Sequence, residues 1–270
     1  MAALPASSAT TGAPLPNGDI KLQPHRAEYT MTLNSTRMSG TAVTGASGKM
    51  TYRFADSCDG WTVENKTAVT FAYSDGAPVA TVWDYVTWES KDGMRFRFHV
   101  RSLRDGQVSE EIAGSASLEA KDKSGTVHFT QPEKKTVSLP PGTIFPTDHT
   151  VRLLEAAQKG TRVLAKVVFD GTDASGPFNV TGVVTRLLPA NSNTSPALSK
   201  VGVNATLLTA PSWFMQLAFF PSTSTEAEPD YEVGLRYYLN GISDEMIQSY
   251  GDFTLKATLD KLEPLTKPDC

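Results

Sequence analysis

The stretch Met94-Arg95-Phe96-Arg97-Phe98-His99-Val100-Arg101 decides the fold class. Every second residue in it is apolar, and the residues between are basic. Side chains of a β-strand alternate between two faces, so this pattern is typical of a strand with one buried and one solvated face. The stretch lies between the dipeptides Asp92-Gly93 and Asp105-Gly106, which favour the positive φ angles of tight hairpin turns.

The same arrangement recurs along most of the chain. Further turn dipeptides occur at Asp75-Gly76, Ser124-Gly125, Asp170-Gly171 and Asn240-Gly241. The chain has 31 threonines and 20 valines, which are β-branched and fit a pleated surface better than a helix. We therefore expect a mainly β protein, built as a long antiparallel meander.

One segment breaks the alternation and predicts a helix over about 147–159. Its apolar residues recur near the helical period of 3.6, Pro146 precedes it, and Gly160 follows it. Thr147 is the expected N-cap. A second, weaker helical turn is predicted over Ser243–Tyr250.

Length and composition exclude several classes of protein. The chain has 270 residues, 40% of them hydrophobic, with a formal net charge of −4. This is enough for a buried core, and it gives no basic surface for nucleic acid. No apolar run reaches the roughly 18–20 residues of a transmembrane helix. We expect a disordered tail over residues 1–20 and one folded domain over 21–270.

The two cysteines, Cys58 and Cys270, lie early in the chain and at its last residue. They are either a disulfide or two free thiols, and a thiol at a chain end has little to pack against. A disulfide would tie the C-terminal strand to an early strand, with a stabilisation of roughly 5 kcal/mol at most by loop entropy. If it forms, the chain resides in an oxidising compartment.

Metal, cofactor and catalytic motifs are not evident in the sequence. The four histidines have no other histidine or cysteine at ligand spacing, so we expect no metal and no cofactor. His149, in the first turn of the predicted helix, is expected to be neutral and structural. Carboxylates are plentiful, among them Asp56, Asp84 and Glu89, and a glycosidase would need two of them to converge in space.

Aromatic residues gather in the strands predicted over Val79–Trp88 and Met94–Leu103. In 82–88 they occupy both faces, because position 88 has the opposite parity to 83 and 85. Such a strand is either covered on both sides or lines a ligand-binding groove on one. The candidate contacts on a concave face are Trp83, Tyr85, Trp88, Phe96 and Phe98.

Three longer segments carry a resemblance to a known family. They are residues 52–61 (YRFADSCDGW), 88–96 (WESKDGMRF) and 139–149 (LPPGTIFPTDH). The chain resembles the DUF1849 or envelope integrity protein B (EipB-like) family of exported α-proteobacterial proteins. The likeness extends over nearly the whole chain after residue 25.

The resemblance implies a fold, a location and a role. The fold would be a curved or spiral, open half-barrel sheet with the helix on its concave side, similar to the lipoprotein carriers of the outer membrane. The location would be the periplasm, with the signal peptide removed, and the family disulfide would map onto Cys58 and Cys270. No enzymatic activity is associated with the family.

Three functional hypotheses follow. The first is a non-enzymatic periplasmic protein that maintains envelope integrity by binding a partner protein or a lipid-like ligand on a curved sheet. The alternative is a cell-wall polysaccharide hydrolase that uses paired carboxylates. The third is an interaction module that recruits a partner through a sheet edge or through the loops Leu188–Lys200 or Pro221–Pro229.

Overall fold

A computed structural model describes residues 18–36 and 43–270. Of the predicted tail at residues 1–20, positions 1–17 lie outside the described part. The strands in chain order are β1 (His25–Thr36), β2 (Val43–Asp56), β3 (Gly60–Tyr73), β4 (Val79–Ser90), β5 (Arg95–Arg104), β6 (Gln107–Leu118), β7 (Gly125–Gln131), β8 (Lys135–Leu139), β9 (Thr143–Ile144), β10 (Val163–Val168), β11 (Phe178–Leu188), β12 (Gly202–Val203), β13 (Ser212–Pro221), β14 (Tyr231–Tyr238), β15 (Ser243–Ser249) and β16 (Phe253–Pro264). The helices are α1 (Pro146–Gln158) and two 3₁₀ turns, η1 (Pro196–Ser199) and η2 (Ala205–Leu208).

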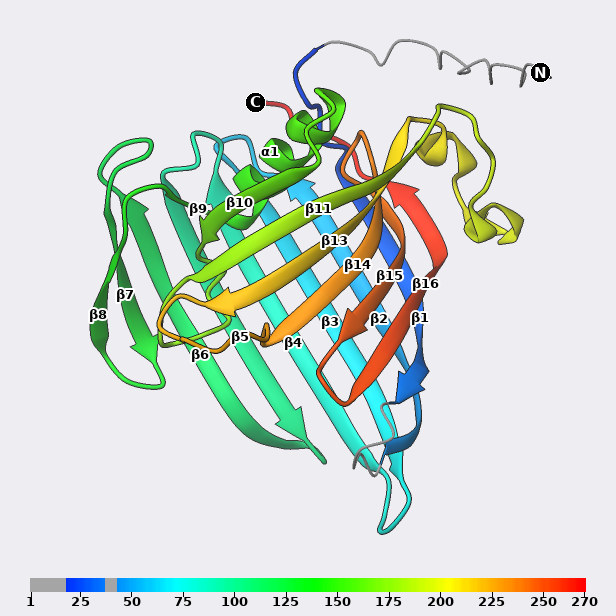
Figure 1. The fold of residues 1–270 in the computed structure, drawn as a ribbon, viewed down its shortest axis with the longest axis horizontal. Helices are drawn as coiled ribbons and strands as arrows, with labels where there is room; N and C mark the ends of the chain where they lie inside the picture. The colour runs from blue at the N-terminus through cyan, green and yellow to red at the C-terminus, as the bar shows by residue number, and fades with distance from the viewer. Residues whose placement is uncertain (1–17, 37–42) are drawn as a thin grey trace, which may run out of the picture.

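All of these strands belong to one curved sheet. Its order is β8-β7-β6-β5-β4-β3-β2-β1-β16-β15-β14-β13-β11-β10-β9, with β12 beside β16. Figure 1 shows the sheet curling round so that β11, β13 and β14 lie in front of β3–β5, with α1 at one end between the two layers. The predicted meander and curved, barrel-like sheet are confirmed, and the pairs β9–β10 and β12–β16 add two short parallel contacts.

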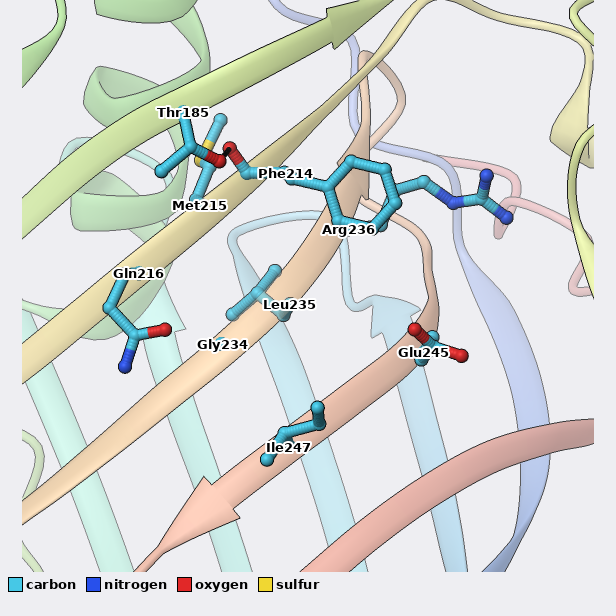
Figure 2. Close-up of a pocket in the computed structure, with 9 residues that line it drawn as sticks. All are labelled: Thr185, Phe214, Met215, Gln216, Gly234, Leu235, Arg236, Glu245 and Ile247. Carbon is cyan, nitrogen blue, oxygen red and sulfur yellow. Dashed lines mark hydrogen bonds between the residues drawn. The ribbon is translucent and has the colours of Figure 1, made fainter.

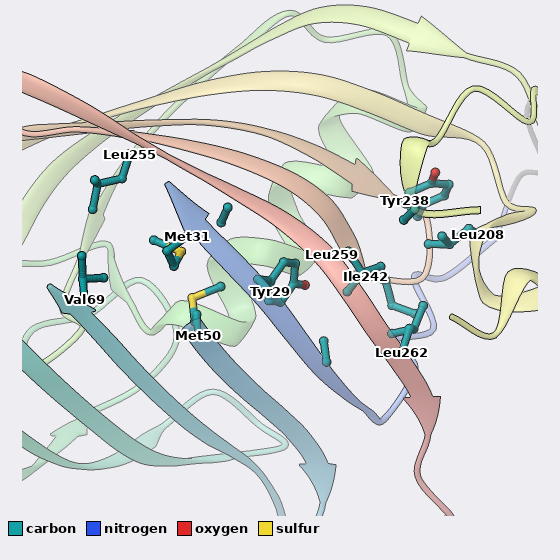
Figure 3. Packing of buried hydrophobic residues seen from close by; sticks show 13 residues of the cluster. Tyr29, Met31, Met50, Val69, Leu208, Tyr238, Ile242, Leu255, Leu259 and Leu262 are labelled. Atoms are coloured by element: carbon teal, nitrogen blue, oxygen red, sulfur yellow. The ribbon is translucent and has the colours of Figure 1, made fainter. Parts of the chain in front are cut away.

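The two halves of the meander meet where β1 pairs with β16. Inward side chains of both strands form a buried cluster that includes Tyr29, Met31, Leu259 and Leu262 (Figure 3). The Tyr29 hydroxyl donates a hydrogen bond of 2.6 Å to the carbonyl of Ser243. The pairing of β1 with β16 and this apolar burial join strands that are more than 200 residues apart in the chain, so the two halves form one continuous sheet.

Strand β5 alternates as the sequence predicts. Phe96, Phe98 and Val100 are 1–4% exposed, whereas Arg97 and His99 between them are exposed. The hairpin that follows turns at Asp105-Gly106, where φ is 50° and 79°. Both central residues therefore adopt the left-handed conformation that this kind of tight turn requires.

Helix α1 starts one residue earlier than predicted, and its N-cap differs. The N-cap is Phe145, which makes no side-chain capping bond, so the predicted cap at Thr147 is wrong. The capping role is filled by the buried Glu89 carboxylate, which belongs to β4. It accepts the amide of Thr147 at 2.7 Å and the amide of Asp148 at 2.9 Å. These amides have no partner within the helix, and a negative charge suits the positive end of the helix dipole.

The C-terminal end of α1 and its buried face agree with the sequence prediction. Gly160, with φ of 77°, follows the last turn, and its amide bonds to the carbonyl of Ala157. Leu153, Leu154 and Ala157 face the concave side of the sheet. They pack there in a cluster that also contains inward residues of β13 and β14, Trp213, Met215, Leu217 and Leu235. The helix therefore lies on the concave side, as expected.

The helical turn predicted over Ser243–Tyr250 is wrong, because this segment is strand β15. It is hydrogen-bonded on both edges, to β14 and to β16. Asp244 at its start is buried and forms an ion pair with Arg236. Tertiary pairing and this buried pair override the weak helical pattern.

Cys58 and Cys270 form a disulfide, with Cα atoms 5.8 Å apart and a sequence separation of 212. Cys58 lies in the turn between β2 and β3. The bond therefore fastens the chain end beyond β16 to the rim of the N-terminal half.

We predict that Glu89→Ala lowers the free energy of unfolding by about 2 kcal/mol, because two helix amides lose their hydrogen-bond acceptor. Urea unfolding measures this change. Glu64→Ala, on the neighbouring strand β3, is the control: Glu64 pairs with Arg53 at an exposed position, and its loss should cost less than ~1 kcal/mol. Equal losses in the two variants would contradict the capping role.

We predict that Cys270→Ser lowers the free energy of unfolding by up to about 5 kcal/mol, since the unfolded chain regains the entropy of a very long loop. Thermal unfolding with and without reductant measures the same contribution. Reductant should destabilise the parent and leave Cys270→Ser unchanged. An unfolding midpoint of the parent that does not change in reductant would show that the disulfide contributes nothing to stability.

Candidate functional site

The five aromatic residues proposed as concave-face contacts fall on both faces of the sheet. Phe98 is the register partner of Thr87, and Trp88 is the partner of Arg97. Because Phe98 is buried on the concave side, Trp83 and Tyr85 share that side, and Trp88 points outward. The Trp88 ring lies 4.5 Å from the Arg97 guanidinium.

Phe96 and Phe98 are part of the packed core and are not open to a ligand. They are joined by Phe129, Phe145 and Phe169 in one buried cluster. Phe96 stacks on Phe145 with ring centroids 5.1 Å apart, and Phe98 meets Phe169 edge-on at 5.3 Å. These contacts fill the concave side between β5–β7 and the segments that flank α1.

Trp83 and Tyr85 instead line a chamber of about 210 Å³. Their rings stack at 5.1 Å with an interplanar angle of 10°, and both side chains are half-buried. The volume corresponds to about seven water molecules. The other lining residues come from the segment before β1, from β2–β4, α1 and β14, and from the turn between β14 and β15: Leu22, Tyr52, Phe54, Val63, Asn65, Thr87, Pro146, Thr147, Thr150, Tyr237, Asn240 and Gly241.

The chamber wall is neutral and amphipathic. Burial raises the pKa of the Tyr52 and Tyr85 hydroxyls, so both stay protonated. The Tyr85 hydroxyl donates to the carbonyl of Asp170 at 2.9 Å, and the Asn65 amide accepts from the Thr67 hydroxyl at 3.1 Å. Such a wall suits an apolar ligand that carries a neutral polar group.

Two titratable groups lie at the first turn of α1, above the chamber. Burial raises the pKa of Glu89 to about 7, against the lowering effect of the helix amides. Burial lowers the pKa of His149 to about 4, with a further effect from the charge of Lys166. The His149 Nε2 atom is buried without a hydrogen-bond partner among the described residues, in keeping with a neutral ring at this position.

The carboxylates with raised pKa are engaged in local hydrogen bonds. Glu89 caps α1. Burial raises the pKa of Asp170, whose Oδ1 accepts the amide and the hydroxyl of Thr172 at 2.9 Å and 2.7 Å. Over residues 18–36 and 43–270, no group of three or more His, Cys, Asp or Glu side chains could hold a metal ion. No helix in the same ranges is long and apolar enough to cross a membrane.

The sequence predicted only part of the chamber. Trp83 and Tyr85 were candidates, but Tyr52, Val63 and Tyr237 were not. Tyr52 lies on β2 and Val63 on β3, each at a position that alternates with outward-facing residues. The alternation in the sequence could therefore have identified both as inward-facing. Tyr237 could not be placed, because β14 approaches β3 and β4 only through the curl of the sheet.

The fold and its chamber define a class of protein: a single, nearly closed β-sheet that encloses one helix and a small aromatic cavity. A crystal structure described as a β-barrel-like protein of domain of unknown function DUF1849, from Brucella abortus, matches with a TM-score of 0.81 at 27% identity, covering 92% of this chain and 100% of that chain. The cell envelope integrity protein EipB of Brucella abortus (strain 2308) is 29% identical over 248 residues, which is 90% of this chain and 85% of that protein. The EipB-like family model matches residues 16–266. The chain belongs to the EipB-like family, as the sequence segments indicated.

Glu89 and His149 should give stability opposite pH dependences. The folded pKa of Glu89 is about 7, above its usual 4.5, so its contribution is complete below pH 4.5 and is lost as the pH rises through 7. The folded pKa of His149 is about 4, below its usual 6.5, so its contribution is complete above pH 6.5 and is lost as the pH falls through 4.

Urea unfolding from pH 4 to 8 measures both contributions. The parent's stability relative to Glu89→Gln should fall between pH 4.5 and 7, and its stability relative to His149→Leu should rise between pH 4 and 6.5. Parallel pH profiles for the parent and both variants would contradict the assigned pKa shifts.

Proposed function

We propose that this protein is a non-enzymatic, periplasmic binding protein that supports cell-envelope integrity, and that it holds a lipid-like ligand in the chamber beside Trp83 and Tyr85. The single observation that carries the proposal is the chamber itself. It is a pre-formed, ring-lined cavity on the concave side of the sheet, and its walls are neutral. The role in the envelope is proposed from the named relative.

The chamber limits the size and charge of the ligand. A volume of about 210 Å³ has room for part of one acyl chain and not for a whole phospholipid. Thr147 lines the chamber and donates its amide to the Glu89 carboxyl group, whose pKa burial raises to about 7. The same burial disfavours the charged headgroup of an ionised fatty acid, and above pH 7 that headgroup would also meet a like charge. A neutral acyl compound, such as a monoacylglycerol, therefore fits better than a free fatty acid.

The position of α1 argues against a carrier that holds several acyl chains in an open half-barrel. The helix and the phenylalanine cluster around Phe96 occupy much of the concave side. What they leave is a small chamber. The space that remains thus supports binding of a single small apolar group.

The alternative of a cell-wall hydrolase gains no support from the carboxylates. A glycosidase needs two carboxyl groups free to act on the substrate. Glu89 is committed to the amides of α1, and Asp170 is committed to Thr172. A non-enzymatic role is therefore the better proposal.

The disulfide supports the proposed compartment. A bond between Cys58 and Cys270 persists in an oxidising environment and is rare in a reducing cytosol. Together with the exported family, this supports a periplasmic location.

Isothermal titration calorimetry with monodecanoylglycerol, below its micelle concentration, tests the proposal. We predict binding to the parent and at least tenfold weaker binding to Trp83→Ala, which removes one of the two stacked rings. Trp88→Ala is the matched control, because it removes a tryptophan from the opposite face of the same strand, and its affinity should stay within twofold of the parent. Urea unfolding of both variants checks that each is folded. No heat of binding to the parent, or equal weakening in both folded variants, would overturn the chamber as the site.

A further inference from the structure

The convex face of the sheet carries both charged pairs and exposed apolar side chains. Outward residues of β2–β4 form charged pairs, such as Arg53 with Glu64 at 2.9 Å and Lys66 with Asp84 at 3.4 Å. On β10 and β11 the outward residues include two exposed valines that are register partners: Val163 is 56% exposed and Val183 is 36% exposed. Exposed apolar residues that cluster on one face are typical of an interaction surface.

A groove of about 240 Å³ lies next to these valines, across β11 and β13–β15. Figure 2 shows Phe214 and Ile247 on either side of Gly234, with Gln216 on the neighbouring strand. Phe214 and Gly234 alternate with inward residues of their strands, so they belong to the convex face. We call this feature the Gly234 groove. The lining residues are Thr185, Phe214, Met215, Gln216, Gly234, Leu235, Arg236, Glu245 and Ile247.

The fold does not require a glycine at position 234. A Cβ atom there would lie 2.7 Å from the Gln216 Oε1, the end of a flexible side chain, and in ordinary contact with the Ile247 carbonyl oxygen at 4.0 Å. By contrast, a Cβ at Gly48 or Gly114 would lie within 2.4 Å of a backbone carbonyl oxygen. Glycine in the interior of a strand weakens it and often marks a place where another molecule comes close. At position 234 the groove is therefore bordered by backbone and by the flexible end of Gln216.

The rim of the groove carries one cation without a carboxylate. The Arg186 guanidinium lies 4.4 Å from the Phe214 ring, and among the described residues it has no ion pair. Glu245 on the other side is paired with Lys256 at 2.8 Å. Arg236 is taken up by the buried Asp244. The uncompensated charge at the groove is therefore positive, although the whole chain is acidic, at −4.

We propose that the Gly234 groove binds a polypeptide segment of a partner protein, which inserts one aromatic side chain beside Gly234 and places a carboxylate against Arg186. The groove is narrow and suits one large side chain. The neighbouring valines extend the apolar surface, so the partner's main chain on either side of the aromatic residue can pack against it. An anchor residue in a pocket with a charged rim is the arrangement that dominates affinity in protein interfaces. The groove lies on the opposite face of the sheet from the chamber, so it does not depend on any ligand there.

Nuclear magnetic resonance titration with a capped peptide, Ac-Ser-Asp-Phe-Asp-Gly-Ser-NH₂, tests this proposal. The peptide should shift the amide signals of Phe214, Gly234 and Ile247. Replacing its phenylalanine by alanine should weaken binding at least tenfold, and replacing both aspartates by asparagine should weaken it about threefold or more. Arg186→Gln should reproduce the second effect in the protein.

Gly234→Val is the decisive variant, because it fills the groove with a residue that suits a strand. It should abolish the shifts while its unfolding midpoint equals or exceeds that of the parent. Ser115→Val is the matched control: it adds the same side chain to an exposed position of β6 on the other half of the convex face, and it should bind as the parent does.

Three outcomes would overturn the proposal. The first is peptide binding that persists in folded Gly234→Val. The second is binding of the parent to phosphatidylglycerol vesicles that Gly234→Val removes while the peptide causes no shifts, which would assign the groove to a membrane. The third is a dimer of the parent in light scattering that Gly234→Val dissolves, which would assign it to a second copy of this chain.

Discussion

The contact between the Glu89 carboxylate and the first turn of α1 determines how the concave side of this protein is used. It joins β4 to a helix 58 residues further along the chain, and it satisfies two amides that the helix cannot satisfy itself. Pro146, Thr147 and Thr150 of that turn line the chamber. The position of the helix therefore sets the size of the chamber. The same contact engages both carboxyl oxygens of the buried Glu89 with helix amides.

Much of the fold could be predicted from local patterns. The alternation in 94–101 identified β5 and its buried face, and Gly160 marked the end of α1 to within a residue. Local patterns failed where a distant partner decides the outcome. Nothing in the sequence near Thr147 indicates that Glu89 replaces it as the cap. An acidic residue in a strand is normally expected to be exposed to solvent, so burial of Glu89 is not predicted. The local pattern of Ser243–Tyr250 likewise favours a helix, and the segment is a strand because it pairs with β14 and β16 on either side.

The candidate site shows the same limit. The alternation of side chains along a strand places Trp83 and Tyr85 on one face and Trp88 on the other, and this can be predicted from the sequence. The sequence cannot show that Phe96 and Phe98 are buried by contact with Phe145 and Phe169, because those two residues follow β8 in the chain and reach β5 only in the folded protein. Strand β14 illustrates how the curl gives one strand two uses: Tyr237 points into the chamber, and Gly234 opens onto the convex groove. A ligand inside and a polypeptide outside would thus be held by opposite faces of one strand.

We propose that the chamber holds a small neutral acyl compound. Native mass spectrometry of the protein purified from the periplasm without detergent tests it most directly. The account predicts that a fraction of the parent carries an added mass of one such compound, which organic extraction releases, and that Trp83→Ala carries markedly less. An apo mass alone for the parent, with no lipid in the extract, would contradict it.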